Sequence, residues 1–414
     1  MKPVVGLGLL LAGLLTVKGL SQHNLSTNSH VTASQVRAWK ERRAAQELAR
    51  HNTDFGFKFF KKLAASSPDK NILFSPLSIS MAFSMLSLGA QDSTLEEIKE
   101  GFNFKELSKK DLHEGFHYLL QRLNQRSQDV RLDLGNMLFM DQRLQPYQKF
   151  LRDVKDLYNA DIIPADFRHL EATQKQINDY VSQKTHGKIS NLIKNIDPGT
   201  LMFLINCIYF RARWKHEFDP KLTKEEDFML DQNKSVKVPL MFHGGMYHVG
   251  EDEQLSCTVL EMPYHENITA IFILPDEGKL ETVEKGLTTK AMARWKNGST
   301  YRTVNVHMPK MTFTGTYKLK KALSHLGISK IFEGHGDLTR ISPYRSLKVG
   351  EAVHKAKLKM DEKGTEGAAG SGAQTLPMEK PAEFKLNRPF LMMIYDETTA
   401  STLFLGKVVN PRGT

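Results

Sequence analysis

Apolar side chains recur at intervals of three and four residues in several segments, mostly in the first half of the chain, and this spacing predicts helices. Shorter apolar or alternating runs, mostly later in the chain, predict β-strands. The predicted helices are 32–63, 78–88, 94–101, 111–126, 148–158 and 170–185, and the predicted strands are 133–140, 201–213, 258–262, 269–274, 304–308 and 403–407. Helices gathered early and strands gathered late indicate an α+β fold rather than a regular alternation of strand and helix.

Two segments alternate between apolar and basic side chains. In the first, one face holds Ile208, Phe210, Ala212 and Trp214, and the other holds Tyr209, Arg211, Arg213 and Lys215. In the second, Ala356, Leu358 and Met360 lie opposite Lys355, Lys357 and Lys359. Each strand is expected to bury its apolar face and to expose its basic face. If both strands belong to one sheet, the two basic rows form one patch.

The chain has 414 residues and 40 % hydrophobic content, and no linker divides it, so residues 21–414 are predicted to form a single domain. Residues 1–20 have the charged start and apolar middle of a cleavable signal peptide, which predicts a secreted, extracellular protein. The alternative is an uncleaved anchor, although the apolar run is short for a membrane span. No later segment is long enough either, so no membrane span is expected.

The cysteines and the short motifs exclude several classes of function. Cys207 and Cys257 are either two buried thiols or one disulfide, and a core of this size does not require the disulfide. No Cys/His cluster has zinc-ligand spacing and no glycine-rich phosphate loop is present, so neither a metal nor a cofactor is expected. The Gly-x-Ser-x-Gly motif of a hydrolase is also missing, which argues against an enzyme.

The charge points to an extracellular polyanion as a partner. Lysine and arginine number 57 against 46 acidic residues, a formal net charge of +11. A sulfated glycosaminoglycan such as heparin is the expected polyanion, whereas nucleic acid belongs to another compartment. The alternative is a basic surface that is only solvated. Glycosylation sequons begin at Asn24, Asn233, Asn267 and Asn297.

The composition changes sharply between Gly364 and Pro381, where small and polar residues replace the core formers. A segment of this length without secondary structure is usually a functional loop or is disordered, and both readings remain open. Small residues fill 367–373, and Leu376, Pro377 and Met378 follow near the end. Pro377 favours an extended backbone and Met378 suits an apolar pocket, so these residues are good bait for a protease.

The segment 364–370, Gly-Thr-Glu-Gly-Ala-Ala-Gly, resembles the hinge of the reactive-centre loop in the serpin family. The resemblance extends to 71–78 (Asn-Ile-Leu-Phe-Ser-Pro-Leu-Ser), to Asn206 followed by Trp214, and to the carboxyl-terminal segments 384–390 and 404–411. It covers about residues 50–411. It implies a fold of three sheets and about nine helices with an exposed loop at about 362–384.

The resemblance also implies a mechanism in which a protease cleaves the bond between Met378 and Glu379 and is trapped while the loop inserts into the main sheet. Thr365 to Met378 spans fourteen residues, the spacing of family members that have methionine at this place. The implied hinge comprises Glu362, Gly364, Thr365, Glu366, Gly367, Ala368 and Ala369. The implied breach residues, at the top of the sheet, are Lys310 and Trp214. The implied shutter residues, lower down, are Ser75, Ser78, Asn206 and His354.

Met378 predicts a target with an apolar primary pocket, either a chymotrypsin-like protease or a tissue kallikrein. A glycosaminoglycan bound at Arg211, Arg213, Lys357 and Lys359 is expected to aid the encounter. The chain is expected to be a monomer. Its resemblance to a serpin of adipose tissue suggests an adipokine with a metabolic role. The alternative function is that of a non-inhibitory serpin, a hormone carrier or cell-surface ligand.

Overall fold

The computed structural model describes residues 33–125, 128–344, 346–364 and 380–413. The chain divides into two units, Met1–Trp39 and Lys40–Thr414, and the architecture below is that of the second. The expected signal peptide, the sequon at Asn24 and the loop residues 365–379 lie outside the described residues.

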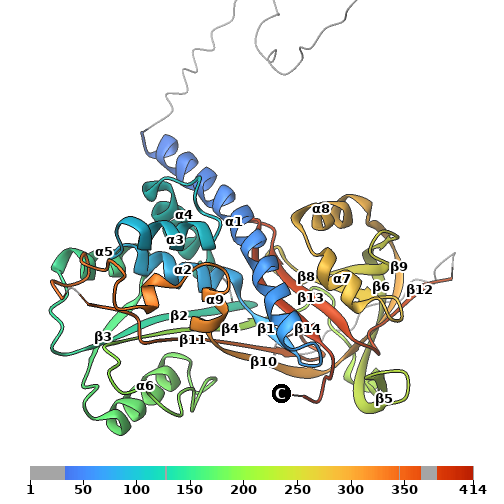
Figure 1. Ribbon diagram of the computed structural model, residues 1–414. Helices are drawn as coiled ribbons and strands as arrows, with labels where there is room; N and C mark the ends of the chain where they lie inside the picture. Colours follow the sequence, from blue (N-terminus) through green and yellow to red (C-terminus); the bar gives the residue numbers. More distant parts are fainter. Residues whose placement is uncertain (1–32, 126–127, 345, 365–379, 414) are drawn as a thin grey trace, which may run out of the picture. The chain divides into compact units, whose positions relative to one another are not determined.

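Nine α-helices occur in the described ranges, which agrees with the expected number (Figure 1). Helix α2 begins where Ser75 accepts a hydrogen bond from the backbone N–H of Ser78 and where Pro76 fills the first helical position. Ser108 caps α4 in the same way. The helices are α1 (Ala33–Ser66), α2 (Pro76–Ser87), α3 (Asp92–Gly101), α4 (Lys109–Asn124), α5 (Gln148–Tyr158), α6 (Leu170–Lys184), α7 (Leu280–Gly286), α8 (Thr289–Gly298) and α9 (Leu319–Ser324). The apolar periodicity predicted α1 to α6, whereas the last three were not predicted.

A five-stranded sheet has the order β10-β11-β4-β2-β3. Its strands are β2 (Val130–Asp141), β3 (Asp161–Ala165), β4 (Met202–Ala212), β10 (Met311–Lys318) and β11 (Glu351–Met360). The two alternating segments are therefore neighbours, because β4 and β11 pair in parallel from Phe203 beside Glu351 to Phe210 beside Leu358. Their apolar rows are buried as predicted. The first row extends past the end of β4 to Trp214.

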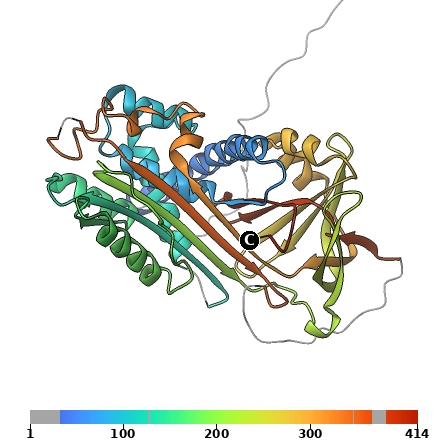
Figure 2. The ribbon, with the colours of Figure 1, turned by 60° about the horizontal axis from the view of Figure 1, so that its bottom comes forward.

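Helix α6 covers part of one face of this sheet (Figures 1 and 2). Ile177 and Val181 on α6 belong to a buried apolar cluster with Phe203 and Ile205 on β4 and Val353 on β11. This cluster is separate from the main core. Helix α6 therefore shares an apolar cluster with β4 and β11, and it contacts β2 where Tyr180 meets Phe139 edge to face.

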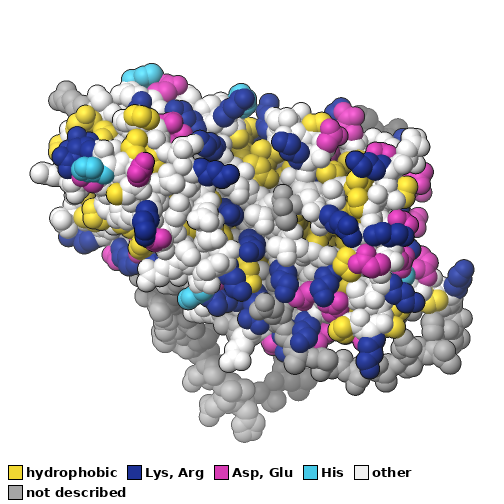
Figure 3. All heavy atoms as spheres, turned by 90° about the horizontal axis from the view of Figure 1, so that it is seen from below, with side chains coloured by type: hydrophobic (Ala, Val, Ile, Leu, Met, Phe, Trp, Pro, Cys, Tyr) yellow, Lys and Arg dark blue, Asp and Glu magenta, His cyan; other side chains and the backbone are white. Residues whose placement is uncertain are grey.

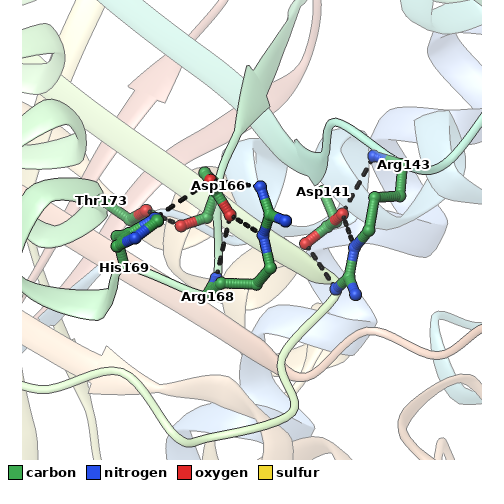
Figure 4. Close-up of polar contacts among 6 residues, drawn as sticks. All are labelled: Asp141, Arg143, Asp166, Arg168, His169 and Thr173. Carbon is green, nitrogen blue, oxygen red and sulfur yellow. Dashed lines mark hydrogen bonds and ion pairs between the residues drawn. The ribbon is translucent and has the colours of Figure 1, made fainter.

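Paired acidic and arginine side chains hold the chain at the start of α6 (Figure 4). Arg168 binds Asp166 through two nitrogens, each 2.8 Å from a carboxylate oxygen, and Thr173 Oγ1 donates to the Asp166 carbonyl at 2.8 Å. The hydrogen bonds from Arg168 hold the pKa of Asp166 well below its usual range. Arg143 binds Asp141 in the same forked manner at the end of β2. The contacts of Asp166 fix the connection from β3 into α6, and the Asp141–Arg143 pair holds the chain where it leaves β2.

The remaining strands form a nine-stranded sheet with the order β1-β14-β13-β8-β7-β6-β9-β12, and β5 also pairs with β6. Its strands are β1 (Ile72–Phe74), β5 (Lys224–Met229), β6 (Ser235–Asp252), β7 (Cys257–Pro263), β8 (Ile268–Pro275), β9 (Thr300–Pro309), β12 (Ala382–Lys385), β13 (Phe390–Asp396) and β14 (Ser401–Val408). Strand β6 pairs with β5 near its start and with β7 near its end. Two of the three implied sheets are thus joined through β6, within an α+β fold as predicted.

The cysteines are free thiols, which excludes the alternative of a disulfide between them. Cys207 is on β4 and Cys257 is on β7, so they belong to different sheets. Burial raises the pKa of each thiol to about 12, so both remain protonated at neutral pH.

Candidate functional site

Strand β11 leads directly into the segment that the resemblance identifies as the loop hinge. Asp361 and Gly364 exchange backbone hydrogen bonds of 3.0 and 3.1 Å, which closes a turn. Gly364 has φ +108°, and a β-carbon there would lie 2.3 Å from the carbonyl oxygen of Ala212, so no other residue fits. Gly364 also forms an antiparallel bridge with Arg213, just beyond β4. The hinge therefore begins in antiparallel contact with the end of β4.

Glu362 is a buried charged residue in this turn. Its Oε2 lies 2.8 Å from Lys310 Nζ, and its Oε1 accepts a hydrogen bond of 2.9 Å from Thr223 Oγ1. Burial alone would raise the pKa of Glu362, but hydrogen bonds from Lys310 and Thr223 outweigh this effect and lower it. The Glu362 carbonyl accepts from the backbone N–H of Phe218 at 2.7 Å. Glu362 thus connects the turn to Lys310, which directly precedes β10, and to Phe218, which follows Trp214.

Trp214 packs beneath the same turn. Its indole stacks on Tyr264 with ring centroids 3.9 Å apart and planes 10° apart. The indole N–H donates to the Asp361 carbonyl at 3.1 Å, and the backbone N–H donates to the Lys363 carbonyl at 3.2 Å. Three of the four residues in the turn therefore have partners at the end of β4, and the hinge starts from a fixed position.

A second cluster lies lower in the sheet, where β4 and β11 meet the start of α2. His354 on β11 lies with Nδ1 2.5 Å from Asn206 Oδ1, and its Nε2 accepts from the backbone N–H of Ser75 at 3.1 Å. Asn206 Nδ2 donates to Ser78 Oγ and to Asn136 Oδ1, both at 2.6 Å. All five residues are buried, so this network connects the parallel strands to each other and to α2.

These contacts determine the state of His354. Because Nε2 accepts from a backbone N–H, the ring proton lies on Nδ1 and the imidazole is neutral. Burial lowers the pKa of His354 to about 3. A proton on Nε2 would remove the acceptor for Ser75, so the network requires the neutral ring.

We expect the native state to lose stability as the pH falls below 6.5. The pKa of His354 is about 3 when folded and 6.5 by reference, so between these values only the unfolded chain takes up the proton. This linkage lowers the free energy of unfolding by about 2 kcal/mol between pH 7.5 and pH 5. Urea midpoints measured across this range test the expectation. The His354→Gln variant should lose this component, and the exposed control His325→Gln should keep it; an unchanged slope in His354→Gln would contradict the assignment.

The pairing of β4 with β11 determines which hydrogen bonds would have to break if the loop inserted into the sheet. A strand that follows β11 through a tight turn and enters between β11 and β4 is antiparallel to both. Insertion must break the parallel hydrogen bonds between them and form two antiparallel ladders, which are more stable per residue. The contacts of His354 with Asn206 cross the same boundary. The apolar cluster that α6 shares with both strands must also rearrange as the sheet widens.

The predicted polyanion-binding residues lie on one face of the five-stranded sheet. Figure 3 shows many Lys and Arg side chains on the face seen from below. Their pairing differs, however. Arg213 contacts Glu217 at 2.7 Å and Asp129 at 3.2 Å. Lys359 Nζ lies 3.0 Å from Asp361, and Lys357 Nζ donates to the Lys188 carbonyl at 3.0 Å. Arg213 is therefore paired with two carboxylates and Lys359 with one.

The three sequons within the described ranges lie at the surface. Asn233 and Asn267 are exposed in the turns between β5 and β6 and between β7 and β8, and Asn297 is exposed in the last turn of α8. Each of these positions leaves room for a glycan. Searched over the residues with described positions, the chain has no metal-ligand cluster of three or more His, Cys, Asp or Glu. Over the same residues, no helix has the length and apolarity to cross a membrane.

Four contributors to these clusters were not predicted: Thr223, Tyr264, Asn136 and Tyr317. Tyr317 stacks on His354, with ring centroids 6.4 Å apart, and its hydroxyl accepts from the backbone N–H of Leu73 at 3.1 Å. Each residue comes from a strand or turn distant in sequence from its partner. No local pattern marks them, because their role depends only on which strands become neighbours.

Comparison with known proteins accounts for this arrangement. Residues 50–411 match the family described as serpin (serine protease inhibitor). Serpin A12 of Homo sapiens, also called vaspin, is 63 % identical over 413 residues, which is 100 % of both chains. Human thyroxine-binding globulin, solved with its hormone, has a TM-score of 0.84 and 36 % identity, and covers 89 % of this chain and 99 % of its own. Mouse protein-Z dependent protease inhibitor has a TM-score of 0.84 at 28 % identity, over 90 % of this chain and 99 % of its own.

The matched range contains the residues of the hinge and of both clusters. A match over residues 50–411, together with a relative of 63 % identity over the full length, identifies the family. The chain belongs to the serpin family of serine protease inhibitors.

Proposed function

We propose that this serpin is a secreted suicide substrate that traps a serine protease after cleavage between Met378 and Glu379. The observation that carries the proposal is the hinge. Gly364 leaves β11 and already bridges Arg213 just beyond β4, and β4 and β11 form the parallel pair that an incoming strand would separate. The small residues of 367–373 then supply a strand that can enter a packed sheet. Membership of the family also makes the chain an inhibitor by class and not an enzyme.

The protease provides the chemistry. Its serine Oγ adds to the carbonyl carbon of Met378, the C–N bond to Glu379 breaks, and the protease returns the proton to the leaving amine. Met378 is then esterified to the serine. Segment 365–377 enters between β11 and β4 before water hydrolyses the ester, and the tethered protease is carried along and distorted. The gain in antiparallel hydrogen bonding drives the movement.

The bait selects the class of protease. An unbranched thioether side chain at Met378 suits an apolar primary pocket, as in chymotrypsin-like proteases or tissue kallikreins. Glu379 places a carboxylate directly after the bond, which narrows the range of acceptable enzymes. Mouse protein-Z dependent protease inhibitor, of similar fold, bears the name of an inhibitor, and this supports the assignment.

The decisive experiment is incubation with a panel of such proteases, followed by denaturing gels and mass spectrometry. The proposal requires an adduct that survives denaturation and a released peptide that begins at Glu379. Cleavage after Met378 without an adduct, across the whole panel, would refute trapping.

A glycosaminoglycan is the proposed accelerator. Replacing Arg211, Arg213, Lys357 and Lys359 with alanine is expected to weaken heparin binding at least about tenfold and to reduce its salt dependence, because fewer charges contact the polyanion. Affinity measured at several salt concentrations tests this. Restoring Arg213 alone should change little, since Glu217 and Asp129 already hold it. A matched control replaces four exposed lysines elsewhere with alanine: Lys221, Lys234, Lys290 and Lys321. An equal loss of heparin affinity in both variants would show that only the net charge matters and would contradict a specific site.

A second function is transport of a hormone. It is favoured by the fold similarity to thyroxine-binding globulin, which was solved with its hormone. Titration with thyroxine, followed by tryptophan fluorescence, would support this function if binding is saturable and the protease panel yields no adduct.

The proposal of a secreted inhibitor further includes export through the segment 1–20, glycans at the exposed sequons and an adipokine role.

A further inference from the structure

A groove of about 940 Å³ lies between α4, α5 and the segment around Arg340, and none of its lining residues belongs to the turn at 361–364 or to the network around His354. Figure 1 shows α4 and α5 on the helical side of the fold. Apolar side chains line part of the groove, with Leu88 from the end of α2 and Phe150 and Leu157 from α5. The trapping mechanism uses none of these residues.

The groove has an excess of positive charge. Its lining includes four cationic side chains and two carboxylates: Lys109, Lys110, Lys149, Arg340, Glu114 and Asp153. Lys149 Nζ lies 2.7 Å from Asp153, and Lys110 Nζ lies 3.8 Å from Glu114. Lys109 and Arg340 make no ion pair with any residue for which the structure gives a position. Two cations thus lie beside apolar surface without a close ion pair, although the carboxylates of Asp153 and Asp337 act on them at longer range.

The two cations affect each other. Burial lowers the pKa of Lys109, and the nearby charges of Arg340 and Lys149 lower it further. Like charges this close repel each other, and a bound anion would relieve the repulsion. The field in the groove therefore favours a negatively charged ligand.

His113 provides an independent sign of a missing partner. It lines the groove with 5 % of its surface exposed, and its Nδ1 lies 2.5 Å from the hydroxyl of Tyr158. The arrangement with fewest unsatisfied groups has the Tyr158 hydroxyl donating to Nδ1, which leaves the ring proton on Nε2. Nε2 has no partner in the described part of the chain. A buried N–H donor without an acceptor is costly.

We propose that this groove binds a long-chain fatty-acid anion, with its acyl chain on Leu88, Phe150 and Leu157 and its carboxylate between Lys109 and Arg340. A neutral hydrocarbon would leave both cations without a close ion pair, and a sulfated glycan would not use the apolar wall. The volume is in the range of small-ligand sites. The N–H of His113 is shielded from solvent, so it gains an acceptor only after a small side-chain movement, which the flexible lysines of the rim permit.

Calorimetric titration of the full chain with monomeric oleate tests the proposal. One oleate per chain should bind, and Lys109→Glu/Arg340→Glu should weaken binding at least about tenfold. The matched control Lys234→Glu/Lys290→Glu changes two exposed lysines by the same charge and should bind like the unaltered chain. Oleyl alcohol, which has the same chain without the charge, should bind at least about tenfold more weakly than oleate.

Two further measurements separate the groove from surface adsorption. Leu157→Gln removes part of the apolar wall and should weaken oleate binding while the urea midpoint confirms folding. The Nε2 resonance of His113 should shift when oleate is added to protein with ¹⁵N-labelled histidine. Equal affinities in the groove and control variants, several oleates per chain, or equal binding of the alcohol would each overturn the proposal.

Discussion

Replacement of Thr365 by arginine is expected to convert the inhibitor into a substrate. Thr365 is the first residue after Gly364, which bridges β4, so it enters the sheet first. Side chains alternate along a strand, and Glu366 cannot face the core; Thr365 must therefore face inward. Burying an arginine there slows insertion, and the ester is hydrolysed before the protease is distorted. Denaturing gels with the target protease should show cleaved Thr365→Arg chain and little or no adduct.

Glu366→Arg is the matched control. It introduces the same side chain one residue later, on the face that remains in solvent, and should still form the adduct. Thr365→Ser keeps a small inward side chain and should also trap the protease. If Thr365→Arg trapped as well as these controls, loop insertion between β11 and β4 would not be the trapping step.

Replacement of Asn206 by alanine is expected to lower the free energy of unfolding of the native state by about 3 kcal/mol. The change leaves the Nδ1–H of His354 without an acceptor and Asn136 Oδ1 without a donor, both in a buried network. Each unsatisfied buried group costs about 1–3 kcal/mol, and the lost side-chain volume adds to the cost. Urea unfolding, monitored by fluorescence and circular dichroism, measures the free energy of the transition in which the native state is lost.

Asn178→Ala is a suitable comparison. Asn178 on α6 also makes two hydrogen bonds of 2.9 Å, with the backbone of Ile193, but it is only partly buried. Water can replace its bonds, so the expected loss is about 1 kcal/mol. Equal losses in the two variants would show that the network around His354 has no special weight.

The fold and the candidate site were predictable to different degrees. The apolar periodicity located α1 to α6, and the alternation of 208–214 and 355–360 identified the buried faces correctly. The opposite face is less exposed than expected, because Tyr209 is buried and the lysines of 355–359 are half-buried. Helices α7 and α9 were missed because seven and six residues give too few turns for a periodic signal, and α8 was missed although it is as long as α3. The hinge, breach and shutter residues were identified from the resemblance to a family, because Glu362, Asn206 and His354 belong to no local pattern.

Local order along the chain determined the helices, the strand faces and the small-residue loop, because each depends on side chains a few positions apart. Only the tertiary structure decided that β4 and β11 are parallel neighbours, that Thr223 as well as Lys310 holds Glu362, and that the proton of His354 lies on Nδ1. It also produced the groove beside α4, where Lys109 meets Arg340. These features depend on contacts between residues far apart in sequence, whose energies exist only once the sheets and helices have packed together.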